Sequence, residues 1–170
     1  REVATTARLR LRRLDDGDAG FIHVLVNDPD WLRYIGDRGV RTLDDARGYI
    51  ARGPVTMYEQ LGIGLFAVEL RDTAVPIGIC GVLKRDGLDD VDLGFAFLPA
   101  YRAQGYALEA AAATLGWARD TRGLRRVLAI TSQDNDASGR LLRKLGFRLE
   151  RTAPLQPDAE AVHVYALELA

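Results

Sequence analysis

The sequence is most informative between Asp92 and Ala110, where it reads DLGFAFLPAYRAQGYALEA. The apolar first part predicts a strand over residues 91–98, and Pro99 ends it because proline donates no hydrogen bond to a sheet. The second part is rich in alanine and predicts a long helix over residues 105–120.

The loop between these two elements, residues 101–107, is a candidate anion site. Its glycine, Gly105, stands where the helix begins, and the first turn of a helix presents backbone N–H groups that lack intrahelical partners. The helix dipole adds about half a positive charge at the same point. The loop therefore suits a phosphate or pyrophosphate. A glycine at such a turn also serves close packing alone, so the spacing by itself leaves both readings open.

The segments before this stretch predict a strand and two helices. Residues 7–14 alternate, with Leu9 and Leu11 on one face, which is typical of a half-buried strand. Acidic residues at 15–18 precede a helix that extends to about residue 26, and a loop follows. Thr42 starts a capping box, so a second helix is expected over residues 42–52, ended by Gly53-Pro54.

Apolar runs and turn residues predict the remaining elements. The expected strands are 64–71, 76–84, 126–131, 147–152 and 162–169, and a further helix spans residues 136–144. Interspersed strands and helices of this kind indicate an α/β (α+β) fold with a mixed central sheet and helices on both faces.

Composition excludes several classes of protein. The chain has 170 residues, 48% hydrophobic, with 23 Lys+Arg against 24 Asp+Glu and a net charge of −1. We expect one domain over residues 1–170, no nucleic-acid partner and no membrane partner. The one cysteine, Cys80, forms no internal disulfide, and with two histidines in the chain we expect no metal site. A reducing cytoplasm is the compartment that this cysteine usage favours.

Motifs for other chemistries are missing from the sequence. Gly62-Ile-Gly64 is not continued to a dinucleotide-binding fingerprint, and no stretch matches a P-loop. The sequence also lacks the Gly-x-Ser-x-Gly motif of the α/β-hydrolases.

Three short blocks together resemble one known family. Residues 92–110 resemble, without gaps, the central motif of the GNAT superfamily of N-acetyltransferases, in particular the branch with the ribosomal-protein alanine N-acetyltransferases. The acyl-CoA motif Gln/Arg-x-x-Gly-x-Gly/Ala is matched by Arg102, Gly105 and Ala107. The block NDASGRLLRKLGF at residues 135–147 resembles the Asn-x-x-Ser helix of this branch, and RLRLR at residues 8–12 is similar to its first strand.

The resemblance implies an activity and its partners. It implies a GNAT-like fold and an acetyl-CoA-dependent transfer of an acetyl group to a primary amine, either a protein N-terminus or a small amine. The amine attacks directly in a ternary complex, no metal takes part, and the protein acts as a monomer or homodimer. The alternative is a non-catalytic acyl-CoA-binding or regulatory module of the same fold, which CoA release with any amine would exclude.

The resemblance also implies which residues bind acetyl-CoA. The pantetheine arm lies between strands 91–98 and 126–131, which splay apart, and contacts the backbone of Phe97 and Leu98. Asn135 lies near this arm, although asparagine is also a preferred helix N-cap. The backbone amides that wrap the pyrophosphate belong to Arg102, Ala103, Gln104, Gly105, Tyr106 and Ala107. The basic residues Arg140, Arg143 and Lys144 either meet the ribose 3′-phosphate or face solvent.

Asp92 and Ser138 are the catalytic residues that the resemblance implies. Asp92 aligns with the glutamate that accepts the amine proton in this branch, and its shorter side chain favours a relay through water. Ser138 is the expected general acid for the departing thiolate. Glu109 also matches a recurrent position of the family and is interpreted as a carboxylate that either lies on the helix surface or braces the loop.

The acceptor side is expected in the first two helices and the loop between them. Trp31, Tyr34 and Tyr49 lie there and serve either acceptor binding or packing. Four acidic residues in the same part of the chain suggest an acidic entrance for the amine: Asp28, Asp30, Asp44 and Asp45.

Overall fold

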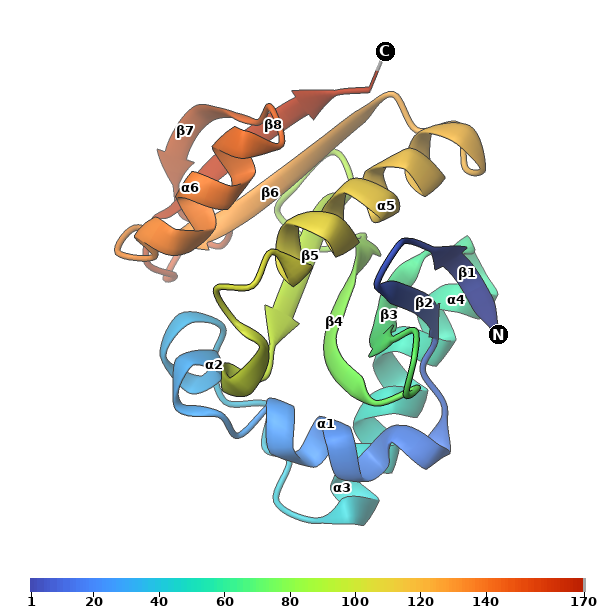
Figure 1. Cartoon of the computed structure of the whole chain (residues 1–170). Coiled ribbons are helices and arrows are strands. Elements are labelled where there is room, and N and C mark those ends of the chain that lie inside the picture. Colours follow the sequence, from blue (N-terminus) through green and yellow to red (C-terminus); the bar gives the residue numbers. More distant parts are fainter. Residues whose placement is uncertain (170) are drawn as a thin grey trace.

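The computed structural model describes residues 1–169 and contains one eight-stranded sheet (Figure 1). The strands are β1 (Glu2–Thr5), β2 (Leu9–Arg13), β3 (Gly64–Leu70), β4 (Pro76–Leu83), β5 (Asp92–Phe97), β6 (Arg126–Ser132), β7 (Arg148–Ala153) and β8 (Val162–Glu168). Their spatial order is β1-β2-β3-β4-β5-β6-β8-β7. Neighbouring strands are antiparallel except β5 and β6, which are parallel. The predicted mixed sheet is confirmed.

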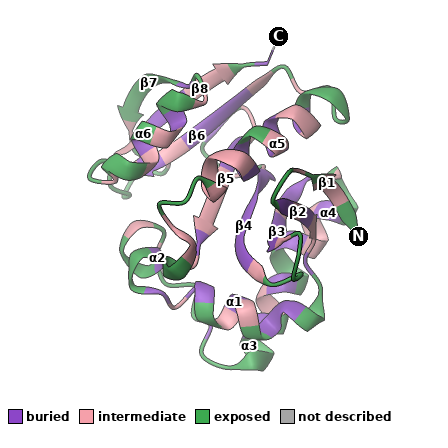
Figure 2. Ribbon diagram, in the orientation of Figure 1, coloured by how far each residue is buried: buried purple, intermediate pink, exposed green. Residues whose placement is uncertain are grey.

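Helices cover both faces of this sheet, also as predicted. They are α1 (Ala19–Leu25), α2 (Pro29–Tyr34), α3 (Leu43–Ile50), α4 (Thr56–Leu61), α5 (Tyr106–Asp120) and α6 (Asp136–Lys144). The buried faces of α4, α5 and α6 contribute to one apolar core, and those of α1, α2 and α3 to another. Figure 2 shows that buried residues are concentrated in β4 and β6, between these layers. Among residues 1–169, no helix is long and apolar enough to cross a membrane.

Side chains along β3 and β4 alternate between the two apolar cores. Phe66 and Cys80 pack into the core beneath α5, whereas their neighbours Ala67 and Ile79 pack into the core beneath α1 and α3. Successive side chains of a strand point to opposite faces. These central strands are therefore apolar on both sides, which explains why their sequence reads as nearly continuous hydrophobic runs.

Two short elements were not expected from the sequence. β1 is an edge strand of four residues, too short for an alternating pattern to stand out. The expected loop around Pro29 is wrong, because Pro29–Tyr34 forms α2. Asp28 caps this helix by accepting a hydrogen bond from the backbone N–H of Asp30 at 3.2 Å. Pro29 occupies the first helical position, where a missing N–H group costs nothing.

The predicted end of the second helix at Gly53-Pro54 is also wrong. Thr42 forms the expected capping box and α3 begins after it. The chain then makes one wide helical turn over Ala51–Val55 and continues as α4. A wide turn accommodates the missing N–H group of a proline within a continuous helix. The hydroxyl of Thr56 donates to the carbonyl of Ala51 at 2.8 Å and so satisfies one backbone acceptor of that turn.

The parallel strands β5 and β6 touch at only one point. Their single residue pair is Asp92 with Leu128, and the N–H of Leu128 donates to the carbonyl of Val91 at 2.9 Å. Beyond this pair the strands diverge, as the family resemblance implied (Figure 1). The sheet is therefore continuous at one end of this boundary and open at the other.

Close packing between β3 and β4 gives a test of the fold. A Cβ atom on Gly81 would collide with the backbone carbonyl of Gly64, whereas a Cβ atom on Gly116 in α5 would meet nothing within 4 Å. We expect Gly81→Ala to lower the free energy of unfolding by about 3 kcal/mol. Gly116→Ala should raise it by up to about 1 kcal/mol through helix propensity. Urea denaturation measures both, and equal effects would contradict this packing.

Candidate functional site

A cleft of about 930 Å³ occupies the gap between β5 and β6. The start of α5, the loop before it, α2 and α6 supply the remaining walls. Most of the sequence-predicted site residues line this cleft: Asp92, Phe97, Arg102, Ala103, Gly105, Tyr106, Ala107, Asn135 and Ser138. Leu98 and Gln104 do not line it. Instead, the carbonyl of Leu98 and the side-chain amide of Gln104 form hydrogen bonds within the adjacent loop.

The loop of residues 101–107 presents backbone donors from its second part, because the N–H groups of Tyr101 and Arg102 already donate to the carbonyls of Leu98 and Pro99 at 3.0 Å and 3.2 Å. Ala103 and Gly105 both adopt left-handed conformations, with φ of 59° and 83°. The first hydrogen bond of α5 joins the N–H of Glu109 to the carbonyl of Gly105, so the amides of Tyr106 and Ala107 have no intrahelical partner. Turns of this type and helix N-termini both bind anions. The geometry thus agrees with the predicted cradle.

Arg8, which lies between β1 and β2, holds this loop in place through its side chain. Its Nη1 atom donates to the carbonyl of Gln104 at 3.0 Å, and its guanidinium lies 4.3 Å from the ring centroid of Tyr106. The amide of Gln104 in turn donates to the carbonyl of Ala100 at 2.9 Å. Glu109 accepts from the Nε atom of Arg8 at 2.7 Å and from its backbone N–H at 3.0 Å. The interpretation of Glu109 as a brace agrees with these bonds, and the role of Arg8 was not foreseen.

The side chain of Arg102 points toward α2. Its Nε atom donates to the carbonyl of Phe97 at 3.0 Å. Its two terminal nitrogens donate to Asp28 at 2.8 Å and to Asp30 at 2.6 Å. Arg102 therefore ties the end of β5 and the loop to the N-terminus of α2. The backbone N–H of Arg102 donates to the carbonyl of Pro99 at 3.2 Å, and the charge of its side chain is shared between two carboxylates.

Asp92 is completely buried at the closed end of the gap. Both of its oxygens accept from Arg85, at 2.9 Å and 3.0 Å. Burial raises the pKa of the Asp92 carboxyl, and the hydrogen bonds from Arg85 only partly oppose this. The partner Arg85 was not identified from the sequence, since nothing in the pattern of residues 84–87 pairs it with Asp92.

Asn135 and Ser138 lie together at the start of α6. The side chain of Asn135 caps the helix by accepting from the backbone N–H of Ser138 at 3.2 Å. The capping role expected for Asn135 is confirmed, and both residues also line the cleft. The helix therefore fixes Ser138 at the cleft wall, in the first turn after the cap.

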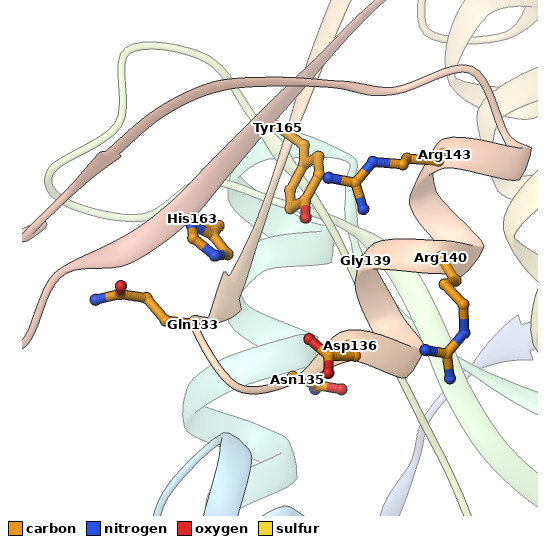
Figure 3. A pocket seen from close by; sticks show the side chains of 8 residues that line it. All are labelled: Gln133, Asn135, Asp136, Gly139, Arg140, Arg143, His163 and Tyr165. Atoms are coloured by element: carbon orange, nitrogen blue, oxygen red, sulfur yellow. The ribbon is translucent and has the colours of Figure 1, made fainter.

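Of the basic residues of α6, Arg140 lines both the cleft and a small neighbouring cavity, Lys144 lines the cleft alone and Arg143 lines the small cavity alone. Arg143 lies over the ring of Tyr165, with 5.5 Å from its guanidinium carbon to the ring centroid, in the small cavity. Figure 3 shows this cavity, with Arg143 and Tyr165 pointing toward each other. Only Arg140 and Lys144 are placed to meet a phosphate in the cleft.

The expected acidic entrance is formed only in part. Trp31, Tyr34 and Tyr49 line the cleft as expected. Asp44 and Asp45 do not, because they lie in the first turn of α3, where Asp45 completes the capping box. Asp28 and Asp30 reach the cleft but are bonded to Arg102.

Cys80 and the two histidines take structural roles. Burial raises the pKa of the Cys80 thiol to about 12, and its sulfur lies 3.3 Å from the hydroxyl of Thr114. A Nε2 atom of His23 lies 3.1 Å from the carbonyl of Arg41, and His163 contacts the hydroxyl of Thr152 at 2.8 Å. None of these three side chains lines the cleft.

Comparison with known proteins identifies the class. A family model described as an acetyltransferase (GNAT) domain matches residues 8–148. The uncharacterised N-acetyltransferase YnaD of Bacillus subtilis is 32% identical over 146 residues, which cover 86% of this chain and 82% of YnaD. A GNAT-family acetyltransferase from Bacillus anthracis superposes with a TM-score of 0.79 at 28% identity, covering 96% of each chain.

The fold is shared with more distant enzymes as well. RimL, a ribosomal L7/L12 alpha-N-protein acetyltransferase solved in complex with coenzyme A, superposes with a TM-score of 0.83 over 99% of this chain and 98% of RimL. At 18% identity this likeness concerns the fold alone. Fold and matches together define an acetyltransferase. The chain belongs to the GNAT acetyltransferase family, which confirms the resemblance seen in the sequence.

The brace around Glu109 gives a test that depends on pH. Burial raises the pKa of Glu109, but hydrogen bonds from Thr6 and Arg8 outweigh it and hold the pKa below the ordinary 4.5. The charged carboxylate therefore stabilises the fold above pH 4.5, and this contribution is lost as the pH falls through the lowered pKa. We expect Glu109→Gln to lower the free energy of unfolding by about 1–2 kcal/mol at pH 7. The difference from the wild type should shrink in acid.

Urea denaturation at a series of pH values measures this effect. Glu59→Gln is the matched control, because Glu59 is exposed in α4. A Glu109→Gln effect that stays constant down to acid pH would contradict the charged brace.

Proposed function

We propose that this protein transfers an acetyl group from acetyl-CoA to a primary amine, with residues 1–170 acting as one domain in the cytoplasm. The observation that carries the proposal is the donor-lined loop at residues 101–107, which lies beside the open gap between β5 and β6. A pyrophosphate and an extended pantetheine arm need such a neighbouring pair of sites.

Groups in the gap fit the pantetheine arm. The N–H of Leu98 donates to Ile77 in β4, so the backbone groups of Phe97 face the side of β6, because successive residues of a strand alternate. The carbonyl of Phe97 accepts from Arg102, which leaves its N–H for a ligand. On β6, the buried hydroxyl of Thr131 has no hydrogen-bond partner among residues 1–169 and lines the cleft. The amides of the pantetheine arm would therefore bind to Phe97, Asn135 and Thr131. The ribose 3′-phosphate of the cofactor would meet Arg140 and Lys144.

The transfer needs two proton movements. The amine nitrogen forms a bond to the acetyl carbon while the carbon–sulfur bond breaks, so the amine loses a proton and the thiolate gains one. Asp92 accepts the first proton through a water, since each carboxylate oxygen keeps a lone pair beyond its bond to Arg85. Ser138, at the wall of the cleft, donates the second. Burial favours Asp92 as a base because it raises the pKa.

A non-catalytic acyl-CoA-binding module is the second candidate. It is favoured by one observation, that both oxygens of Asp92 are already bonded to Arg85. The two candidates differ in turnover: an enzyme releases CoA when an amine is present, and a binding module does not.

A substitution in the loop tests acetyl-CoA binding. We expect Gly105→Asp to abolish binding, because its carboxylate would stand against the pyrophosphate. Gly105→Asn is the matched control, since it places a neutral side chain of the same shape at the same left-handed position. Calorimetry with acetyl-CoA measures both variants. Equal affinity of Gly105→Asp and Gly105→Asn would overturn the assignment of the loop.

Substitution of Asp92 tests the proton acceptor. We expect Asp92→Asn to lower kcat by about 100-fold, the lower range for a general base. Because burial raises the pKa of Asp92, the wild-type kcat should fall as the pH drops through that pKa, and the variant should lose this acid limb. Steady-state CoA release from pH 5 to 9 measures both. A variant with the wild-type pH profile would remove Asp92 from the mechanism.

A further inference from the structure

The half of the cleft beneath α2 and α3, which we call the acceptor half, is rich in hydrogen-bond donors. It is lined by Trp31, Tyr34, Arg38, Tyr49 and Arg85. The indole N–H of Trp31 is buried and has no partner among residues 1–169. The side chains that line this half supply two guanidinium groups, an indole N–H and two phenols.

The carboxylates that border this half are already bonded within the protein. Asp28 and Asp30 both accept from Arg102, at 2.8 Å and 2.6 Å. Asp92 accepts from Arg85 through both of its oxygens. Each of these three carboxylates is therefore bonded to an arginine, and Asp28 and Asp30 share a single guanidinium group.

The cations of the acceptor half retain unused donors. Within residues 1–169, no carboxylate lies within ion-pairing distance of Arg38, whose side chain is exposed. Arg85 uses Nε and Nη2 for Asp92, which leaves Nη1 for another acceptor. Both arginines act on Tyr49: burial raises the pKa of its hydroxyl, and the two positive charges together with a hydrogen bond from Arg38 oppose this. The phenol of Tyr49 therefore lies within the field of both guanidinium groups.

We propose that the acceptor is a primary amine that also carries a carboxylate, and that Arg38, Arg85 and Tyr49 bind this carboxylate. The inference rests on the proposed acetyl transfer and names the substrate class of the same site. Arginine suits the role because its planar donors match a carboxylate. Free amino acids and acidic protein N-termini share this chemistry. Polyamines and aminoglycosides lack it and would meet unpaired positive charge.

Matched acceptors test the proposal. The first pair of acceptors is a free amino acid and its carboxamide, and the second is a tripeptide with Glu or with Gln at its second position. For each acceptor we would measure CoA release and, by calorimetry, binding to the CoA-loaded protein. We expect kcat/KM and affinity to be at least about 10-fold higher for the carboxylate member of the preferred pair. A preference among free amino acids indicates a small-molecule acceptor, and one among tripeptides indicates a protein N-terminus.

The variant Arg38→Gln tests the residues. It should lower kcat/KM and affinity for the carboxylate acceptor about 10-fold, leave the carboxamide unchanged and leave the affinity for acetyl-CoA unchanged. Arg52→Gln is the control, because Arg52 is exposed on the turn after α3 and does not line the cleft. Equal loss for both members of a pair would overturn the carboxylate site.

The two proposals fail in different ways. Equal use of carboxylate and carboxamide, or better use of spermidine, would overturn the carboxylate inference while acetyl transfer stands. Preferential binding of the carboxylate member without CoA release would refute the transfer and support the carboxylate site.

Discussion

The cleft of this molecule depends on one constraint, the single residue pair between β5 and β6. Asp92 and Leu128 hold the two parallel strands together at one end, and the strands diverge beyond them. Continued pairing would fill the gap with backbone hydrogen bonds and leave no cleft. Divergence instead leaves strand edges with unused donors and acceptors, and an extended ligand can satisfy them in place of a neighbouring strand. The ion pair of buried Asp92 with the partly exposed Arg85 lies where the strands part.

Two arginines position the loop beside this opening, and each connects it to a different part of the chain. Arg8 joins it to the β1–β2 side of the sheet through Gln104 and Glu109. Arg102 joins it to α2 through Asp28 and Asp30. The donor-lined loop and the helix that borders the acceptor half are thus one bonded unit. A shift of the loop on binding a pyrophosphate would be transmitted to the acceptor side.

Local patterns in the sequence predicted most of the fold, but not the contacts that complete the site. The central strands and α5 were predictable because apolar periodicity and alanine content act within a few residues. The wide turn at Pro54 was not, because a proline that usually ends a helix is accommodated there. The short α2 was not, because its six residues are too few to show a helical period. Arg102 bonds Asp28 from 74 positions away, and Arg8 bonds Glu109 from 101. No pattern in a single sequence pairs such residues, so the partners of Arg8, Asp92 and Arg102 emerged only in three dimensions.

The same long-range pairing decides the polarity of the site. Counted along the chain, Asp28, Asp30, Asp44 and Asp45 make the acceptor region acidic. In the fold, two of them bond Arg102 and the other two lie in the first turn of α3. In the acceptor half, the donors that remain available to a ligand are those of Arg38, which forms no ion pair among residues 1–169, and the spare donors of Arg85. The net charge of −1 therefore does not describe what a substrate meets, because a ligand responds to the groups that face it and not to the sum over the chain.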